Sequence, residues 1–357
     1  MIDYIVVGLG LSGISFCHQL QKQQHSFVVI DNGKQSASRV GSGLFNPIAL
    51  KRTKPAWMGH QLMSTSMPTY KALEMELGVR LIHHASILKI MHQKVDINDW
   101  HQASVQDDCK PYMNPNIQQN RNPGIRAAFG FGEVTNTGWV NTALLVDEFT
   151  TYLKSKEKLM QETFEANDLQ MDDNCVRYRD IKAKHIVFAQ GVGGLTHNPW
   201  FSQVTLQQTK GELMIIESKD LQEKSIIKGG VFMIPLGNHR YRVGSTYNWK
   251  DQNEGPTQKA QLRLQQQLDK MIQVPYHIVS QSAGFRPTLP DRKPVIGVHP
   301  QFSHLAICNG MGSRGVLQAP FCVTQAASKN ASFSSNRPYH LVENPAQTVT
   351  SFEALKE

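Results

Sequence analysis

The sequence lacks several features that would place the chain in other classes of protein. No uninterrupted apolar run reaches the roughly 18 residues needed to span a bilayer, and there is no internal repeat or low-complexity tract. The apolar start, residues 2–16, has no basic segment before it and carries glycines at fixed spacing, so we do not interpret it as a signal peptide. The expectation is a cytoplasmic protein without a transmembrane segment.

Cysteine is scarce, and no arrangement of residues suggests a metal site or a nucleophilic triad. The five cysteines are odd in number and contain no C-x-x-C spacing, so the pattern predicts neither a disulfide framework nor a zinc site. No Ser-His-Asp constellation is evident. The pair His83-His84 and the region 60–67 are candidates for a segment that covers a substrate, although adjacent histidines favour an exposed surface.

What is present is an ordinary globular composition. The 357 residues are 40% hydrophobic and 18% charged, with 26 Gly and 17 Pro, and a chain of this length favours two domains. The formal charge of +8 is compatible with anionic ligands, an acidic membrane surface or nucleic acid. Because the basic residues are scattered, with only short groups at 51–54 and 154–158, a solvated surface is favoured and nucleic-acid binding is not expected.

The first 31 residues carry the strongest signal. A β-branched run at 4–7 enters Gly8-Leu9-Gly10-Leu11-Ser12-Gly13, a helical stretch follows at 14–21, and a second apolar run at 27–30 ends in Asp31. This order is the βαβ dinucleotide fingerprint, in which the glycines allow a tight turn, close approach of a pyrophosphate and packing of helix on strand. The acid would accept hydrogen bonds from ribose hydroxyls. The fingerprint alone does not separate FAD from NAD.

The remainder predicts alternating strands and helices. Strands are expected at 161–166, 175–179, 185–191, 213–216, 231–234, 241–244 and 305–308, and helices at 142–156, 257–271 and 316–327. The strands between 213 and 244 would form an antiparallel sheet in a second domain, whereas the strand at 185–191 would rejoin the first sheet.

Taken together, the sequence resembles the D-amino-acid oxidase superfamily of flavoproteins, and most of all its glycine oxidase branch. The resemblance spans almost the whole chain. Its landmarks are Gly8 to Gly13 with Asp31, then 38–47, 189–191, 210–212 and 243–246, then Ala283-Gly284-Phe285-Arg286-Pro287 with Asp291, Pro294 and 296–297, and finally 310–315 with Ala319-Pro320.

The resemblance implies an α/β protein in which a Rossmann-type FAD-binding domain is interleaved with a second α+β domain containing a mixed, largely antiparallel sheet. The FAD-binding domain would comprise 1–75, 136–205 and 286–357, and the substrate domain 76–135 and 206–285. FAD would be held noncovalently, since no cysteine matches the covalent attachment site of the related sarcosine oxidases. The expected cofactor-binding residues are Gly8, Leu9, Gly10, Leu11, Ser12, Gly13, Asp31, Asn32, Ser38, Arg39, Gly43, Leu44, Glu165, Ala189, Gly191, Arg286, Gly310, Gly312, Ser313, Arg314 and Gly315.

The resemblance also implies a reaction. Arg286 matches the arginine that binds the substrate carboxylate, and the expected activity is oxidation of the Cα–N bond of an amino acid or N-substituted glycine by hydride transfer to flavin N5. The partners would be a small-molecule amine and an electron acceptor, O2 or another carrier. A homo-oligomer is compatible with the sequence.

Three departures from the glycine oxidase pattern leave the substrate open. Phe232 lies in the segment before Pro235 where those relatives usually have a tyrosine, and Met311 and Ser313 stand in place of His and Arg. One alternative is an FAD enzyme that removes carboxymethyl from a modified tRNA wobble uridine, although no methyltransferase domain accompanies it here. The other is a noncatalytic flavin-binding protein whose active site has decayed.

Overall fold

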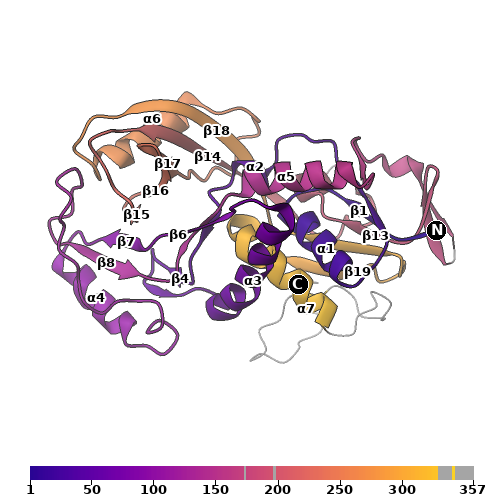
Figure 1. Ribbon diagram of the computed structural model, residues 1–357, viewed down its shortest axis with the longest axis horizontal. Helices are drawn as coiled ribbons and strands as arrows, with labels where there is room; N and C mark the ends of the chain where they lie inside the picture. The colour runs from indigo at the N-terminus through magenta and orange to yellow at the C-terminus, as the bar shows by residue number, and fades with distance from the viewer. Residues whose placement is uncertain (173, 196–197, 329–339, 342–357) are drawn as a thin grey trace.

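The computed structural model describes residues 1–172, 174–195, 198–328 and 340–341 of the 357. Two large sheets, one at each end of the molecule, organise this part of the chain (Figure 1). None of the helices in these ranges combines the length and the low polarity that crossing a membrane would require.

The first sheet has nine strands, and its centre is parallel. The order is β10-β2-β1-β13-β20-β19-β21, with β12 paired to β13 and β11 to β12. The bounds are β1 (Ile2–Val7), β2 (Phe27–Ile30), β10 (Leu159–Met160), β11 (Leu169–Asp172), β12 (Cys175–Tyr178), β13 (Ile181–Phe188), β19 (Val295–Val298), β20 (Leu305–Asn309) and β21 (His340–Leu341). Strands β10, β2, β1, β13 and β20 run parallel, as the continuous apolar runs of β1 and β2 predict for strands covered on both faces.

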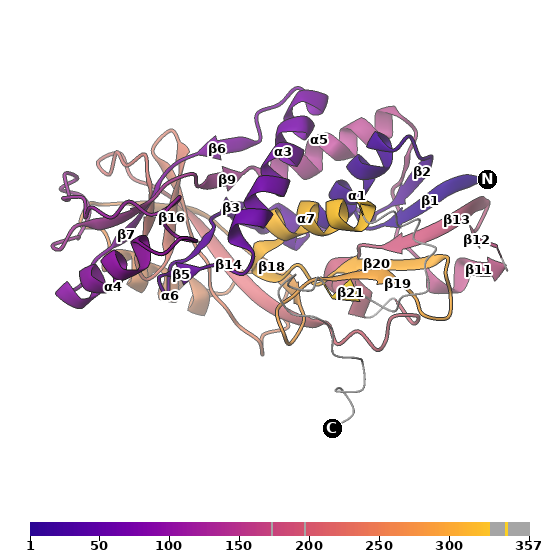
Figure 2. The same cartoon turned by 90° about the horizontal axis from the view of Figure 1, so that it is seen from below.

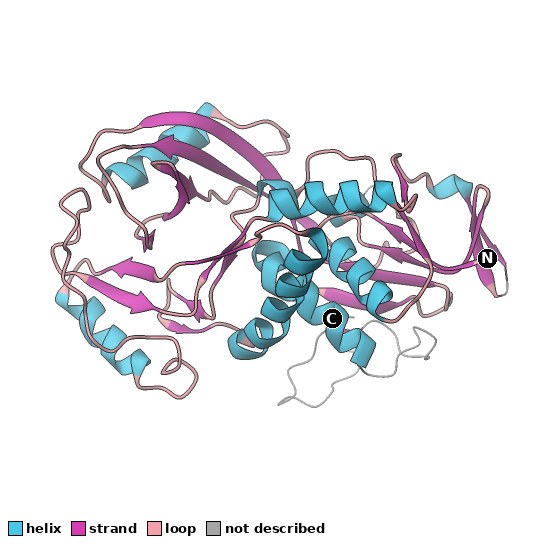
Figure 3. Cartoon of the chain, in the orientation of Figure 1, coloured by secondary structure: helices cyan, strands magenta, loops and turns pink. Residues whose placement is uncertain are grey.

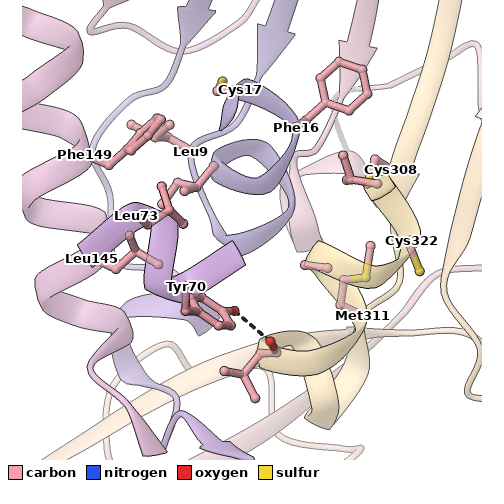
Figure 4. Close-up of a cluster of buried hydrophobic side chains, with 14 of the residues drawn as sticks. Leu9, Phe16, Cys17, Tyr70, Leu73, Leu145, Phe149, Cys308, Met311 and Cys322 are labelled. Atoms are coloured by element: carbon pink, nitrogen blue, oxygen red, sulfur yellow. Dashed lines mark hydrogen bonds between the residues drawn. The ribbon is translucent and has the colours of Figure 1, made fainter. Parts of the chain in front are cut away.

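Helices cover one face of this sheet. They are α1 (Leu11–Lys22), α3 (Gly59–Leu77), α5 (Thr142–Ser155) and α7 (Gly315–Ser328), and α7 lies between the sheet and α3 in the second view (Figure 2). Their apolar sides form one cluster with the sheet, in which the Tyr70 hydroxyl donates to the Val316 carbonyl at 2.7 Å (Figure 4). All five cysteines are buried and free, so none forms a disulfide.

The second sheet has seven strands in the order β18-β14-β17-β16-β15-β7-β8. The bounds are β7 (Ile87–Ile90), β8 (Phe131–Val134), β14 (Gln207–Glu217), β15 (Ile226–Lys228), β16 (Phe232–Gly237), β17 (Arg240–Gly244) and β18 (His277–Thr288). Only β15 and β7 pair in parallel, so the sheet is mixed and largely antiparallel, as expected. Helix α6 (Gln258–Asp269) packs its Leu264 and Leu268 against one face, on the outside of the molecule (Figure 3).

Smaller elements join the two sheets. They are α2 (Ala37–Val40), α4 (Lys94–Ser104), the three-stranded sheet of β3 (Leu44–Phe45), β9 (Gly138–Val140) and β6 (Ile82–His84), the hairpin of β4 (Ile48–Ala49) and β5 (Lys54–Pro55), and the 3-10 turns η1 (Ala166–Asp168), η2 (Gly191–Leu195) and η3 (Gly312–Arg314). The chain passes between the large sheets several times, which confirms the interleaved α/β architecture. The residues at which one domain gives way to the other stay a prediction.

Two details differ from the expectations. No strand forms at 161–166: the short β10 ends at Met160, and Phe164 is buried with its ring stacked on Tyr178 at 5.0 Å, so packing rather than strand pairing fixes this segment. The region 60–67 is the start of α3, a 19-residue helix. Its Ser66 hydroxyl donates to the Leu317 carbonyl at 2.5 Å inside the core, so this region is not a free lid.

The adjacent histidines lie in β6. The ring of His83 stacks on Trp139 with 4.1 Å between centroids, whereas His84 is exposed and meets the edge of Phe45. Burial lowers the pKa of His83, which favours its neutral form. We expected both histidines to be exposed, and only His84 is; His83 is partly buried.

Candidate functional site

The glycine turn between β1 and α1 is closed by close backbone packing. Gly8 has φ +99°, and a Cβ there would lie 2.6 Å from the carbonyl oxygen of Ala189, which directly follows the neighbouring strand β13. A Cβ on Gly13 would lie 1.9 Å from the carbonyl oxygen of Gly8. A side chain at either position would force strand and helix apart.

Gly10 occupies a different environment, with only the Ser38 side chain within 4 Å of a Cβ built there. The Ser38 hydroxyl accepts a hydrogen bond from the backbone N–H of Leu11 at 3.0 Å. Gly10 is the residue that precedes α1, and it has no side chain to cap the helix. The positive end of the helix dipole therefore faces the space beside Gly10, which only the Ser38 side chain borders. The Ser12 side chain turns the other way, into the core against the Cys308 thiol.

Asp31 directly follows β2, and its carboxylate binds backbone N–H groups of two loops, the glycine turn after β1 and the loop after β2. One carboxylate oxygen accepts from the backbone N–H of Leu9 at 2.7 Å and the other from that of Gly33 at 2.8 Å. Each oxygen keeps lone pairs for a further donor. The neighbouring Asn32 is exposed and its amide contacts the Thr163 hydroxyl at 3.4 Å.

The segment after α2 lies against α5 and β9. Arg39 forms an ion pair with Asp147 of α5, so its guanidinium is already engaged by the protein. Gly43 has φ +69°, and a Cβ there would lie 1.9 Å from the carbonyl oxygen of Val140, which requires glycine. Leu44 begins β3.

The turn after β13 reaches the same edge of the sheet as the glycine turn. Ala189 is buried beside Gly8, and Gly191, with φ +58°, has nothing within 4 Å of a Cβ and so borders open space. The Asn309 amide donates to the Gly191 carbonyl at 2.9 Å. Glu165 lies before η1, and its backbone N–H donates to the Tyr178 hydroxyl at 3.2 Å.

Two glycines of the loop from β20 to α7 have positive φ angles, which favour glycine. Gly310 has φ +77°, and a Cβ there would lie 2.0 Å from the Leu289 side chain. Gly312 has φ +54° and starts η3. Gly315 begins α7, and a Cβ there would come no closer than 3.4 Å to a neighbour, the Met311 side chain. Met311 forms an isolated β-bridge with Thr288, so this loop lies directly beside the end of β18.

Arg314 is the notable side chain of this loop. Its Nη1 atom is buried and has no hydrogen-bond partner within the described ranges. Burial lowers the pKa of the guanidinium, which shows that its charge is removed from water. Ser313, next to it, is exposed.

Arg286 lies on β18, two residues before Thr288. Its Nη2 atom donates to the Ser245 hydroxyl at 2.6 Å and its Nη1 atom to the Thr246 carbonyl at 3.3 Å. The guanidinium carbon lies 4.2 Å from the ring centroid of Tyr247. A Cβ on Gly211 of the neighbouring strand would lie 2.2 Å from Nη2, so the absent side chain makes room for the guanidinium.

No carboxylate neutralises Arg286 in the part of the chain that the structure describes. Asp291, the sequence's candidate partner, is exposed and accepts instead from the backbone N–H of Lys293 at 3.0 Å. Burial lowers the pKa of Arg286. A half-buried cation without an anion in the protein is suited to binding an anionic ligand.

The structure thus brings Arg286 and the 310–315 loop together. At the carboxyl ends of the central strands β1, β2 and β13 it brings together Gly8, Gly10, Asp31, Ala189 and Gly191. Sequence reasoning missed Tyr247 and Arg242. Arg242 lies on the same sheet face as Arg286, with its guanidinium carbon 5.6 Å from the Trp139 ring and a hydrogen bond of 3.2 Å to the Ser42 carbonyl. The segment 243–246, a landmark of the family resemblance, lies between these two residues in the sequence, but it did not indicate that Arg242 or Tyr247 would lie near the site.

These residues fit a flavin dinucleotide. The open side of Gly10 at a helix N-terminus suits a pyrophosphate, and the buried Nη1 of Arg314 lacks an acceptor that a bound ligand would provide.

Comparisons with known proteins agree with this arrangement. Residues 3–327 match the family model DAO, FAD dependent oxidoreductase. The chain is 22% identical over 342 residues to glycine oxidase of Bacillus subtilis (strain 168), covering 89% of this chain and 90% of the relative. It is 24% identical over 341 residues to glycine oxidase of Bacillus licheniformis, with the same coverage.

A similar fold is found in the crystal structure of glycine oxidase from Geobacillus kaustophilus, with a TM-score of 0.76, 16% identity and coverage of 92% of this chain and 94% of that one. Because the family model covers most of the chain, the protein belongs to the DAO family of FAD dependent oxidoreductases, and FAD is its cofactor.

Proposed function

We propose that this enzyme oxidises the Cα–N bond of an amine that carries a carboxylate, an amino acid or an N-substituted glycine. The observation that carries the proposal is the half-buried guanidinium of Arg286, which no carboxylate of the described chain neutralises. The names of the glycine oxidase relatives agree with this substrate class.

Arg286 would bind the substrate carboxylate through two parallel charge-assisted hydrogen bonds. Ser245 and Thr246 fix the guanidinium from one side, and Tyr247 covers it, so that its fork is oriented before substrate arrives. Such preorganisation places the substrate Cα reproducibly, which accounts for a large part of the rate of a reaction between bound groups.

FAD would be held by the residues at the edge of the nine-stranded sheet together with the 310–315 loop. Gly8, Gly10 and Gly13 would leave room for the pyrophosphate in the turn, Asp31 would accept from the ribose, and the loop before α7 would offer backbone N–H groups. When bound, the flavin supplies the two-electron acceptor for the hydride that leaves Cα.

The chain's own residues then need only bind, orient and exclude water. The substrate must lose hydride as the neutral amine, and the positive charge of Arg286 near the site favours that form over the ammonium. No strong side-chain base is required. The imine product would be hydrolysed in water to a keto acid or aldehyde and an amine.

An anaerobic screen of amino acids and N-alkyl glycines tests the proposal through bleaching of the flavin absorbance. Bleaching by a carboxylate-bearing amine, and not by the matching amine without a carboxylate, is expected. If no such amine bleaches the flavin, the proposal is wrong, and bleaching only by tRNA with a carboxymethylaminomethyl wobble uridine would identify the alternative substrate. Repeating the reaction in air identifies whether O2 is the electron acceptor.

A further inference from the structure

Two lysines lie opposite each other on the face of the seven-stranded sheet that carries Arg286. Lys228 of β15 pairs with Lys89 of β7 in the parallel register, which puts the two side chains side by side on strands about 4.8 Å apart. Lys228 also pairs with Phe232 of β16. From there a row of directly paired residues crosses the sheet through Gly244 and Leu213 to Ser282 of β18, and we call it the Lys228 row. Like charges at opposite positions of neighbouring strands destabilise a sheet.

A third lysine and a hydroxyl complete the group. The hairpin of β4 and β5 brings Thr53 to Lys89, whose Nζ atom donates to the Thr53 hydroxyl at 2.7 Å. Lys51 of the same hairpin is close enough for its charge to act on Lys228. We call Lys51, Thr53, Lys89 and Lys228 the lysine cluster.

The protein does not neutralise this charge with an ion pair. None of the three lysines has a carboxylate oxygen within 4 Å among the residues with assigned positions. The Nζ atom of Lys228 donates to the Gly229 carbonyl and lies 4.9 Å from the Phe232 ring centroid. These contacts hold the ammonium groups in place without cancelling their charge.

The electrostatics of the cluster are those of an anion site. Burial first, and then the charges of Lys89 and Lys51, together lower the pKa of Lys228 to about 8. Burial also lowers the pKa of Lys89, which the carboxylates of Asp96 and Asp99 on α4 only partly offset. A bound anion would stabilise the charged form of each lysine.

We propose that the lysine cluster binds a phosphate-type oxyanion, either free phosphate or the phosphate of a larger molecule. Lys89 and Lys228 each keep two ammonium donors beyond their bonds to Thr53 and Gly229, and these donors, with Lys51 and the Thr53 hydroxyl, can surround a tetrahedral dianion. Four strand spacings and four residues along β18 separate the Lys228 row from Arg286, a backbone distance on the order of 20 Å. The lysine cluster therefore lies away from the Arg286 guanidinium, and the inference does not depend on the role proposed for Arg286.

Calorimetric titration of the FAD-loaded enzyme with inorganic phosphate, at constant ionic strength set with chloride, tests the site. Lys228→Met and Lys89→Met keep most of the side-chain volume and should each weaken phosphate binding at least ten-fold. Lys182→Met is the matched control, because Lys182 is exposed on β13 of the other sheet, and it should bind as the wild type does. Binding that is equal in all four proteins, or undetectable in the wild type, would overturn the proposal.

Ribose 5-phosphate identifies the source of the phosphate. Tighter binding than inorganic phosphate would show that the site takes the phosphate of a larger molecule, and equal or weaker binding would show that it takes the free ion.

Stability without phosphate gives an independent readout. Because Lys228 opposes Lys89, Lys228→Met should leave the phosphate-free protein at least as resistant to urea as the wild type, and added phosphate should raise the urea midpoint of the wild type but not of the variant. A marked loss of stability in Lys228→Met, with no protection of the wild type by phosphate, would mean that Lys228 is only a packing residue.

Discussion

The guanidinium carbon of Arg286 lies 4.2 Å from the centroid of the Tyr247 ring, and Tyr247 is 51% exposed. The tyrosine therefore shields a charged group from water while remaining at the surface itself. An exposed aromatic residue in this position stabilises the cation modestly, by about 0.5–1 kcal/mol.

Replacement of Arg286 tests the carboxylate site most directly. Arg286→Ala should leave FAD bound and lower kcat/KM by about thirty- to a thousand-fold, because a bidentate charged contact in a partly desolvated site contributes on the order of 2–4 kcal/mol. Arg286→Lys should recover only part of the loss, since an ammonium cannot reproduce the planar fork. Steady-state kinetics with the best substrate of the screen measure both.

Arg263→Ala serves as the control, because Arg263 is exposed on α6 at the outer face of the sheet. It should behave as the wild type. Unchanged rate and affinity in Arg286→Ala would make Arg286 a structural residue and remove the main support for the substrate class.

Tyr247→Leu should have a smaller effect of a different kind. Loss of the ring exposes the Arg286 fork to water and loosens its orientation, so we expect KM to rise by about two- to five-fold with little change in kcat. A fall in kcat as large as that of Arg286→Ala would instead mean that the phenol contacts the reacting groups.

Much of this arrangement was predictable from local sequence patterns. The βαβ unit from β1 to β2 and the strand β20 entering the loop before α7 are each encoded by a short apolar run next to glycines, and both were found within a few residues of the predicted bounds. The Gly-Phe-Arg-Pro context singled out Arg286 as the residue that binds the substrate carboxylate, and that role stays a prediction.

Other features depend on contacts between distant segments and leave no local pattern. Tyr247 and Arg286 are 39 positions apart, and their stacking follows from the pairing of β14 with both β17 and β18. The lysine cluster likewise requires the register of β15 with β7. The strand expected at 161–166 was wrong: strand pairing ends at Met160, and Phe164, the one large apolar residue of the segment, is instead buried against Tyr178.

Gly10→Val should abolish FAD retention. The only side chain near a Cβ at this position is that of Ser38, so the chain itself tolerates a larger group better here than at Gly8 or Gly13, while a branched side chain would fill the space of the pyrophosphate. The flavin absorbance of the purified protein measures retention. Gly255→Ala, in an exposed loop where a Cβ comes no closer than 3.6 Å to a neighbour, should stay yellow.

FAD should be released when the protein is denatured with acid or heat. All five cysteines are buried, and burial raises the pKa of the Cys308 thiol, which contacts Ser12 of the glycine turn, to about 12, so this thiol is not a reactive thiolate at neutral pH. Separation of the denatured chain by filtration should leave the yellow colour in the filtrate. Flavin that stays with the polypeptide would contradict noncovalent binding.

The last prediction concerns the loop that holds Arg286 in place. Lys210 is fully buried, and its Nζ atom lies 2.9 Å from a carboxylate oxygen of Asp251 and 3.7 Å from one of Glu212. Glu212 in turn accepts from the Thr257 backbone and hydroxyl, so the network ties the middle and the far end of the 245–257 loop to β14. The near end is held by the Glu212 backbone N–H, which donates to the Thr246 hydroxyl at 2.9 Å. Lys210→Met would leave Glu212 buried beside no cation.

We therefore expect Lys210→Met to lower the free energy of unfolding by on the order of 3 kcal/mol in urea titrations. Because the same loop carries Ser245 and Tyr247, the variant should also lose part of its kcat/KM through a higher KM, even at temperatures where it is fully folded. Lys182→Met should change neither quantity. A folded Lys210→Met enzyme with wild-type KM would show that contacts other than this buried ion pair hold the loop over Arg286.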